Sequence, residues 1–175
     1  MVKIADRAGI PCYLKPEQLP WYRDKSATRA LLTELGLPTP GFRKIPIAYF
    51  KDRSKRTQLK ELLEGLRYPV VSKPLDKYGS RGIYISEDLG ELINGAEKTA
   101  GFSDMPEILV EEYNDGYEFN MMTWVRHGKV HVISIADREK TFVAKGEIPI
   151  STRNVYPSRL LPKVEKPATE LLQAY

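Results

Sequence analysis

The chain has 175 residues, enough for one domain or two small lobes with a buried core. Its 27 basic and 23 acidic residues are interspersed and give a net charge of +4, which argues against a nucleic-acid-binding protein. The single cysteine, Cys12, excludes an internal disulfide and fits a reducing compartment. Because the sequence contains no secretory signal and no long apolar run, we expect a cytoplasmic protein that does not enter a membrane.

The first third of the chain is predicted to be mostly helical. Asp24 is a good N-cap for a helix that Gly36 would end, and Ser54 is expected to cap a second helix with a stripe of leucines. The segment before Asp24 contains a short helix ended by Gly9 and then a proline-rich linker. The predicted elements are helices over residues 2–8, 25–35 and 54–66, and a strand over residues 45–50.

The middle of the chain is organised around residues 68–85, which begin Tyr-Pro-Val-Val-Ser-Lys-Pro and end Gly-Ser-Arg-Gly-Ile-Tyr-Ile. Two β-branched valines after a proline favour a strand that ends near Lys73, and the alternation after Gly82 favours a return strand. A lysine at a strand end is a natural partner for phosphate oxygens. Gly79 and Gly82 allow the backbone N–H groups of the loop to face an anion.

The same residues also fit an ordinary hairpin with a surface lysine, so this motif alone leaves both interpretations open. Two other phosphate-binding arrangements are excluded. The chain has no P-loop of the form G-x-x-x-x-G-K-[ST]. In protein kinases the glycine loop precedes the strand lysine, whereas here it follows Lys73.

The remainder of the chain is predicted to form one helix, an antiparallel sheet and an irregular tail. Ser86 is expected to cap the helix, and the period of the apolar residues changes to two after Gly101. Met121, Met122 and Trp124 are expected in the core, whereas His127 and His131 are interpreted as structural and not as metal ligands. The predicted segments are strands over 107–113, 117–126 and 129–136, an irregular stretch over 137–162 and a helix over 168–175 opened by Pro167.

Three stretches in a fixed order resemble the ATP-grasp ligases. Residues 68–85 resemble the ATP-binding hairpin of that family, residues 24–40 its upstream helix, and residues 108–118 its interlobe segment. The resemblance covers about residues 1–160 and is closest to the carbamoyl phosphate synthetase large chain, biotin carboxylase and glycinamide ribonucleotide synthetase branches.

The resemblance implies an α+β fold of two small α/β lobes whose antiparallel sheets sandwich a nucleotide. Residues 1–23 would end a preceding domain, residues 24–106 would form the N-terminal lobe, and residues 107–175 would form part of the C-terminal lobe. The family's magnesium ligands come from a later strand pair, and nothing after Val155 matches that segment. We therefore expect a fragment whose metal ligands lie outside this chain and which turns over little or no ATP.

The resemblance also assigns residues to a nucleotide site. Lys73 and Lys25 would contact phosphates. Lys25 could instead extend its apolar stem along the surface. A cation in the first turn of a helix opposes the helix dipole, however, and this favours phosphate binding by Lys25. The closing loop would be Gly79, Ser80, Arg81 and Gly82. The interlobe hinge, whose backbone would pair with adenine, would be Glu111, Glu112, Tyr113 and Asn114. Glu118 would accept ribose hydroxyls, and Asp137, Arg138 and Lys140 would face the second substrate.

The implied function is ATP-dependent ligation, in which a carboxylate and ATP form an acyl phosphate that passes to an amine or similar nucleophile. The implied partners are ATP with Mg²⁺ and a small carboxylate, with no nucleic acid and no membrane, while homo-oligomerisation stays open. Two alternatives remain at this point. One is an adenine-nucleotide-binding module without catalysis, and the other is a basic interaction domain that binds no ATP.

Overall fold

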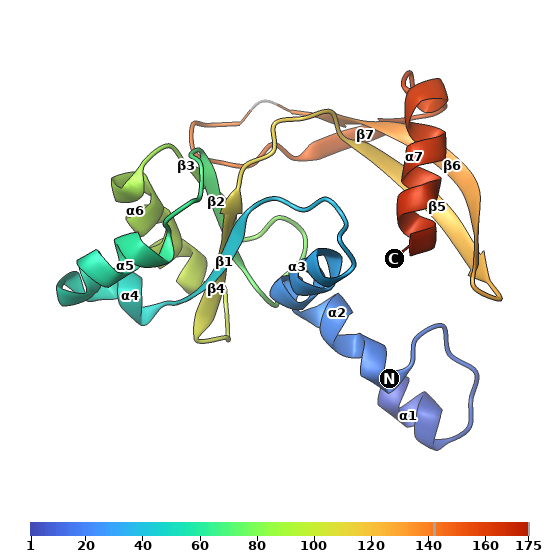
Figure 1. Cartoon of the computed structure of the whole chain (residues 1–175), viewed down its shortest axis with the longest axis horizontal. Coiled ribbons are helices and arrows are strands. Elements are labelled where there is room, and N and C mark those ends of the chain that lie inside the picture. Colours follow the sequence, from blue (N-terminus) through green and yellow to red (C-terminus); the bar gives the residue numbers. More distant parts are fainter. Residues whose placement is uncertain (142, 175) are drawn as a thin grey trace.

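The computed structural model describes residues 1–141 and 143–174 and contains two antiparallel sheets, each accompanied by helices (Figure 1). The first sheet has four strands in the order β1-β4-β2-β3, and the second has three in the order β5-β6-β7. The predicted mixture of helices and antiparallel sheets is therefore confirmed. Within the part of the chain that the structure describes, no helix is long and apolar enough to span a bilayer.

The first sheet is covered on one face by three helices that enclose the main hydrophobic core. Side chains alternate between the two faces of a strand, so Val70 of β2 and Val110 of β4 point into this core while their neighbours point away. The strands are β1 (Phe42–Pro46), β2 (Val70–Pro74), β3 (Tyr84–Ser86) and β4 (Glu107–Glu112), and the covering helices are α4 (Ala48–Lys51), α5 (Arg56–Leu62) and α6 (Leu89–Ala100). The core side chains with no exposed surface are Ile45, Phe50, Leu59, Val70, Leu92, Ala96, Ile108 and Val110.

The opposite face of the first sheet looks towards the N-terminal helices (Figure 1). There α3 (Lys25–Glu34) follows α2 (Leu19–Arg23), whereas α1 (Val2–Arg7) lies farther from the sheet. Alternation places Lys73 of β2 and Glu111 of β4 on this face. This face therefore carries charged groups, in contrast to the apolar face under α4–α6.

Two of the three predicted helix starts differ in the structure, because an aspartate and not the expected serine acts as the cap. Asp24 accepts a hydrogen bond from the Ser26 N–H at 2.8 Å, as predicted for the start of α3. Asp88, not Ser86, caps α6, and the carboxylate of Asp52 accepts from the Ser54 N–H at 2.9 Å at the start of a 3₁₀ turn before α5. In both cases a carboxylate two residues from the predicted serine accepts the hydrogen bond from a free N–H group at the helix start.

Two predictions in the first lobe were wrong in detail. The strand predicted over residues 45–50 is divided between β1 and α4, because Phe50 is buried from a short helix and not from a strand. An apolar run of this length does not distinguish a strand from a short helix. The strand β4, assigned from sequence to the second sheet, pairs with β1 and β2 in the first sheet.

The second sheet consists of a long hairpin and one further strand, with a helix along it (Figure 1). The hairpin turns at His127 and Gly128, both with positive φ, as the sequence predicts. The stretch predicted as irregular, 137–162, instead contains the end of β6, all of β7 and the start of the last helix. The elements are β5 (Phe119–Arg126), β6 (Lys129–Lys140), β7 (Ser151–Val155) and α7 (Leu161–Ala174). Pro167, predicted to open the last helix, lies inside α7, and Tyr175 lies outside the described residues.

Two of the three core positions predicted in the second sheet are exposed, and the third, Met121, is only half-buried. Trp124 and Met122 are 48% and 61% exposed, so their assignment to the core was wrong. Trp124 instead makes an edge-on ring contact with Tyr13 of the N-terminal segment, with 5.8 Å between centroids. The face of this sheet that carries these residues is consequently much less covered than either face of β2 and β4.

Candidate functional site

The end of β2 carries a buried ion-pair cluster centred on Lys73. The ammonium of Lys73 donates to Oε1 of Glu111 on β4, and the side chains are 14% and 8% exposed. Arg29 of α3 donates to the same carboxylate, with Nε 2.9 Å from Oε2 and Nη2 3.3 Å from Oε1. One carboxylate therefore joins two cations from two other elements of the fold.

The protonation of this cluster follows from burial and charge. Burial lowers the pKa of Lys73, while the carboxylate of Glu111 acts in the opposite direction. Burial alone would raise the pKa of Glu111, but the hydrogen bond from Arg29 and the charge of Lys73 outweigh it and lower that pKa below its ordinary value. Glu111 is thus a carboxylate, and the cluster holds two positive charges and one negative charge.

Lys25, at the first position of α3, is the second predicted phosphate-binding lysine. Its ammonium donates to backbone carbonyls at and just after the end of β2, at 3.0 Å from Pro74 O and 3.4 Å from Leu75 O, and also to Lys77 O. Burial and the nearby charge of Lys73 lower its pKa. Lys25 is therefore close enough to Lys73 for their charges to interact, and its ammonium is hydrogen-bonded to backbone carbonyls at the start of the glycine-containing loop.

The predicted closing loop has an open tip and a fixed end. Gly79 and Ser80 have φ values of 72° and 58°, and a Cβ on Gly79 would meet nothing within 4 Å. Gly82, with φ of 68°, is buried: a Cβ there would lie 2.8 Å from the side chain of Phe102, and its carbonyl accepts from Thr99 Oγ1 at 2.9 Å. Gly79, Ser80 and Arg81 are exposed, so movement in this loop would be concentrated in them.

The predicted hinge leaves the first sheet at the end of β4. The backbone amides of Glu112 and Tyr113 are occupied, since they donate to Gly41 O and Pro69 O, each at 2.9 Å. The carboxylate of Glu112 points to the core side of the sheet and accepts two side-chain hydrogen bonds from Arg67. These bonds lower the pKa of Glu112 to about 2.

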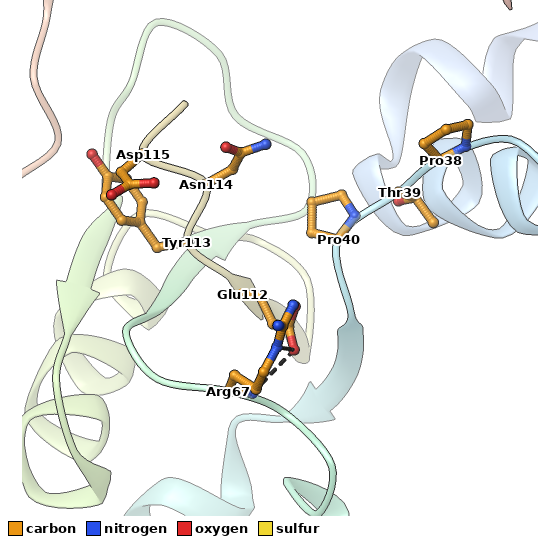
Figure 2. Close-up of a pocket in the computed structure, with 8 residues that line it drawn as sticks. All are labelled: Pro38, Thr39, Pro40, Arg67, Glu112, Tyr113, Asn114 and Asp115. Carbon is orange, nitrogen blue, oxygen red and sulfur yellow. Dashed lines mark hydrogen bonds and ion pairs between the residues drawn. The ribbon is translucent and has the colours of Figure 1, made fainter. Parts of the chain in front are cut away.

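A cavity of about 440 Å³ lies beside the hinge (Figure 2). The Arg67–Glu112 ion pair lies at one end of it, with Nη2 3.0 Å from Oε2. Its lining residues are Pro38, Thr39, Pro40, Arg67, Glu112, Tyr113, Asn114 and Asp115. This cavity faces the α3–β1 connection, and neither Lys25 nor Lys73 lines it.

A second cavity, of about 370 Å³, lies between the two lobes. It is lined by Ile85 of β3, by Tyr113 of the hinge, by Lys140 of β6 and by the segment that follows β6. Residues 143–149, which we name the crossing segment, pass along the free edge of β3: the Ile85 N–H donates to Gly146 O at 2.8 Å, and Lys145 pairs with Glu91 of α6 at 3.0 Å. The lobes are therefore connected both by the hinge and by the crossing segment.

The predicted ribose and substrate residues gather on the second lobe. Glu118 accepts from Lys140 Nζ at 2.9 Å and lies 3.2 Å from Arg138 Nη1, beside a cavity of about 520 Å³. Asp137 is 2% exposed and is engaged inside the protein, where Ser158 Oγ at 2.5 Å and Arg159 Nε at 2.9 Å lower its pKa to about 2. Asp137 thereby holds the residues that precede α7, whereas Arg138 and Lys140 border the cavity.

The side chains that the structure describes offer no cluster of metal ligands. Within residues 1–141 and 143–174, no three His, Cys, Asp or Glu side chains lie close enough together to hold a metal ion. The carboxylates near Lys25 and Lys73 are already engaged: Glu111 by Arg29 and Lys73, Asp76 by Lys77 and Ser103, and Asp24 by Ser26.

Sequence reasoning missed two parts of this site. Arg29 lies four residues after Lys25, and that spacing on a helix places both side chains on one face, so the pattern could have indicated it. The crossing segment had no comparable signal, because its contacts with β3 join residues about sixty positions apart along the chain.

Comparison with curated sequences gives partial matches only. No family model matches the chain. It is 34% identical to cyanophycin synthetase of Synechocystis sp. over 117 residues, which are 66% of this chain and 12% of that protein. It is 28% identical to the N-terminal section of the carbamoyl phosphate synthase large chain of Methanopyrus kandleri over 116 residues, 66% of this chain and 19% of that protein. The chain thus spans a fifth or less of these curated relatives.

Solved structures match almost the whole chain. The VanG D-Ala:D-Ser ligase from Enterococcus faecalis superposes with a TM-score of 0.80 at 22% identity, over 99% of this chain and 50% of that chain. An L-amino acid ligase from Bacillus licheniformis superposes with a TM-score of 0.66 at 25% identity, over 99% of this chain and 38% of that chain. A phosphoribosylglycinamide synthetase from Anaerococcus prevotii has a TM-score of 0.64 at 20% identity, over 99% of this chain and 40% of that chain.

Proposed function

The chain has the ATP-grasp fold, as the sequence resemblance predicted, and from this premise we propose that it is the nucleotide-binding part of an ATP-dependent carboxylate–amine ligase. The observation that carries the proposal is the meeting of Lys73 and Lys25 at the end of β2, next to an exposed glycine-containing tip. The names of the matched enzymes support it, since several are ligases that join amino acids.

In this proposal the phosphates bind at the end of β2. Lys73 and Lys25 supply two fixed positive charges, and the N–H groups around Gly79 and Ser80 cover the phosphates from above. Each charge-assisted hydrogen bond would contribute roughly 1.5–3 kcal/mol. Binding requires the ammonium groups to exchange their present acceptors, Glu111 and the loop carbonyls, for phosphate oxygens.

The base and sugar are proposed to lie between the lobes. The first lobe lines this cavity with Pro69, Ile85 and Glu87, and the apolar side chains of Pro69 and Ile85 suit the faces of an adenine ring. Because the amides of Glu112 and Tyr113 are occupied, the amide of Asn114 is the next hinge group able to pair with the adenine edge. Glu118 would accept the ribose hydroxyls in place of one of its present cations.

The reaction proposed for the longer enzyme proceeds in two steps. A carboxylate oxygen of the substrate attacks the γ-phosphorus, the bond to the β–γ bridging oxygen breaks, and ADP leaves with that electron pair. The amine then attacks the acyl carbon, inorganic phosphate leaves, and the amine loses a proton. Lys25 and Lys73 contribute by binding and orienting the phosphates in line with the attacking oxygen. ATP normally arrives with Mg²⁺, but the described residues do not form a site for that ion, and no step is assigned to it.

Calorimetric titration of the chain with ADP tests this proposal. We expect saturable binding, and we expect Lys73→Ala to weaken it by about tenfold or more because a charged phosphate contact is lost. Lys60→Ala, on the exposed side of α5, is the matched control and should bind like wild type. Absence of saturable heat at millimolar ADP would contradict the proposal. ADP binding without ADP formation, even by a longer chain with substrates, would favour a non-catalytic nucleotide-binding module.

A further inference from the structure

We propose that Arg29 is a positioning residue that keeps the ammonium of Lys73 available to a nucleotide phosphate by sharing the carboxylate of Glu111. The inference rests on the proposed function and deepens it, because it assigns a role to a residue outside the predicted site. Arg29 would act through Glu111 and would not itself bind the nucleotide.

The geometry gives Glu111 two competing partners. Arg29 approaches with its planar fork, Nε at 2.9 Å from Oε2 and Nη2 at 3.3 Å from Oε1, while Lys73 donates to Oε1 alone. The arginine therefore touches both carboxylate oxygens, and the lysine shares one of them. An arginine fork is preorganised for such a two-point contact, whereas an ammonium is a point charge on a flexible stem.

Because the carboxylate of Glu111 is buried, it needs to keep a cationic partner. The side chain of Glu111 is 8% exposed, and a buried carboxylate without a cationic partner is strongly unfavourable. If Lys73 were its only partner, turning the ammonium towards a phosphate would leave that carboxylate unpaired. With Arg29 in place, Glu111 retains a bidentate partner while Lys73 moves.

The two cations of α3, Lys25 and Arg29, have different partners. Lys25, the other cation of α3, is engaged with the carbonyls of the loop and does not contact Glu111. Arg29 itself is 25% exposed, more than Lys73 at 14%. Helix α3 thus carries two cations on one face, one directed to the loop and one to β4.

Four chains distinguish this role: wild type, Arg29→Met, Glu111→Gln and the double variant. We expect Arg29→Met to weaken ADP binding by about tenfold, because Lys73 becomes the sole partner of a buried carboxylate. We expect Glu111→Gln to reverse this loss, so that the double variant binds ADP about as tightly as Glu111→Gln alone, because the competing charge is gone. Arg29→Lys should fall between wild type and Arg29→Met, and melting temperatures establish that each chain is folded.

A second measurement needs no nucleotide. Acylation of amines by an N-hydroxysuccinimide ester, read by mass spectrometry, should modify Lys73 several-fold more slowly in Arg29→Met than in wild type, relative to Lys60 in the same sample, and Glu111→Gln should restore the rate. Unchanged Lys73 reactivity in Arg29→Met, or a double variant as weak in ADP binding as the single one, would overturn the inference. Failure of wild type to bind ADP would overturn the proposed function, while the acylation result would still decide the role of Arg29.

Discussion

The two sheets of this molecule are both antiparallel, yet they are buried to very different extents. In the first sheet, Val70, Ile108 and Val110 have no exposed surface, and even the polar face of β4 holds a buried carboxylate. In the second sheet, Ile133 is 58% exposed and Met122 61% exposed. The first lobe therefore carries the two lysines beside a well-buried sheet, whereas the second lobe contributes its charged residues from a sheet with more exposed side chains.

The largest expected effect comes from matched truncations in the two sheets. Ile108→Ala empties a fully buried position and should lower the free energy of unfolding by about 2–5 kcal/mol. Ile133→Ala removes an exposed side chain of the same type and should change it by less than about 0.5 kcal/mol. Urea denaturation of both variants measures the contrast. Equal losses would show that the second sheet is as well packed as the first.

The next effect compares two glycines of the same loop. Gly82→Ala combines a left-handed backbone with a clash against Phe102 and should cost about 2–4 kcal/mol of folding free energy. Gly79→Ala has a similar φ but open space around it, so only the backbone cost of about 1–2 kcal/mol is expected. If the two alanine variants unfold at the same denaturant concentration, the loop end is not fixed against Phe102 as described.

A third effect concerns acid stability in the second lobe. The pKa of Asp137 is lowered from 3.8 to about 2, chiefly by the hydrogen bond from Ser158. Its contribution to stability is therefore present above pH 3.8 and is lost as the pH falls from there towards 2. Melting temperatures should fall over this window in wild type, and Asp137→Asn should be less stable at neutral pH but should vary less below pH 4. A parallel pH profile for both chains would contradict this account.

The smallest expected effect is a local one at the tip of the loop. Arg81 is exposed, whereas Lys77 is tied to Asp76 at 3.1 Å and to Asp104. Brief trypsin treatment should therefore cut after Arg81 sooner than after Lys77, and ADP should slow that cut because the tip would close over the phosphates. Mass spectrometry of the fragments identifies the site. Equal cleavage with and without ADP, in a chain that binds ADP, would remove the closing role from this tip.

Much of the first lobe could be predicted because its signals are local. The proline before Val70, the glycines of the loop and the N-cap Asp24 each act within a few residues, and they correctly indicated β2, β3 and α3. The hairpin turn at His127 and Gly128 was recognised for the same reason.

The remaining features depend on contacts between distant segments. Arg29 and Glu111 are 82 positions apart, so no local pattern could reveal that Arg29 and Lys73 share the carboxylate of Glu111. The strand β7 carries mostly polar, partly exposed side chains, and it forms because β6 offers a free edge and not because of its own periodicity. The exposed Trp124 illustrates the converse, since an apolar strand residue indicates burial only when another layer covers it.

Hydrogen exchange with and without ADP tests the central claim most directly, because it reports where on the chain a nucleotide binds. The account predicts protection of backbone amides in residues 70–86 and in residues 111–118 together, with no change in α5 or at the hairpin turn around Gly128. Lys73→Ala should abolish both sets of protection at an ADP concentration that saturates wild type. Protection confined to one lobe, or appearing elsewhere while these two segments stay unchanged, would contradict a nucleotide held between the lobes.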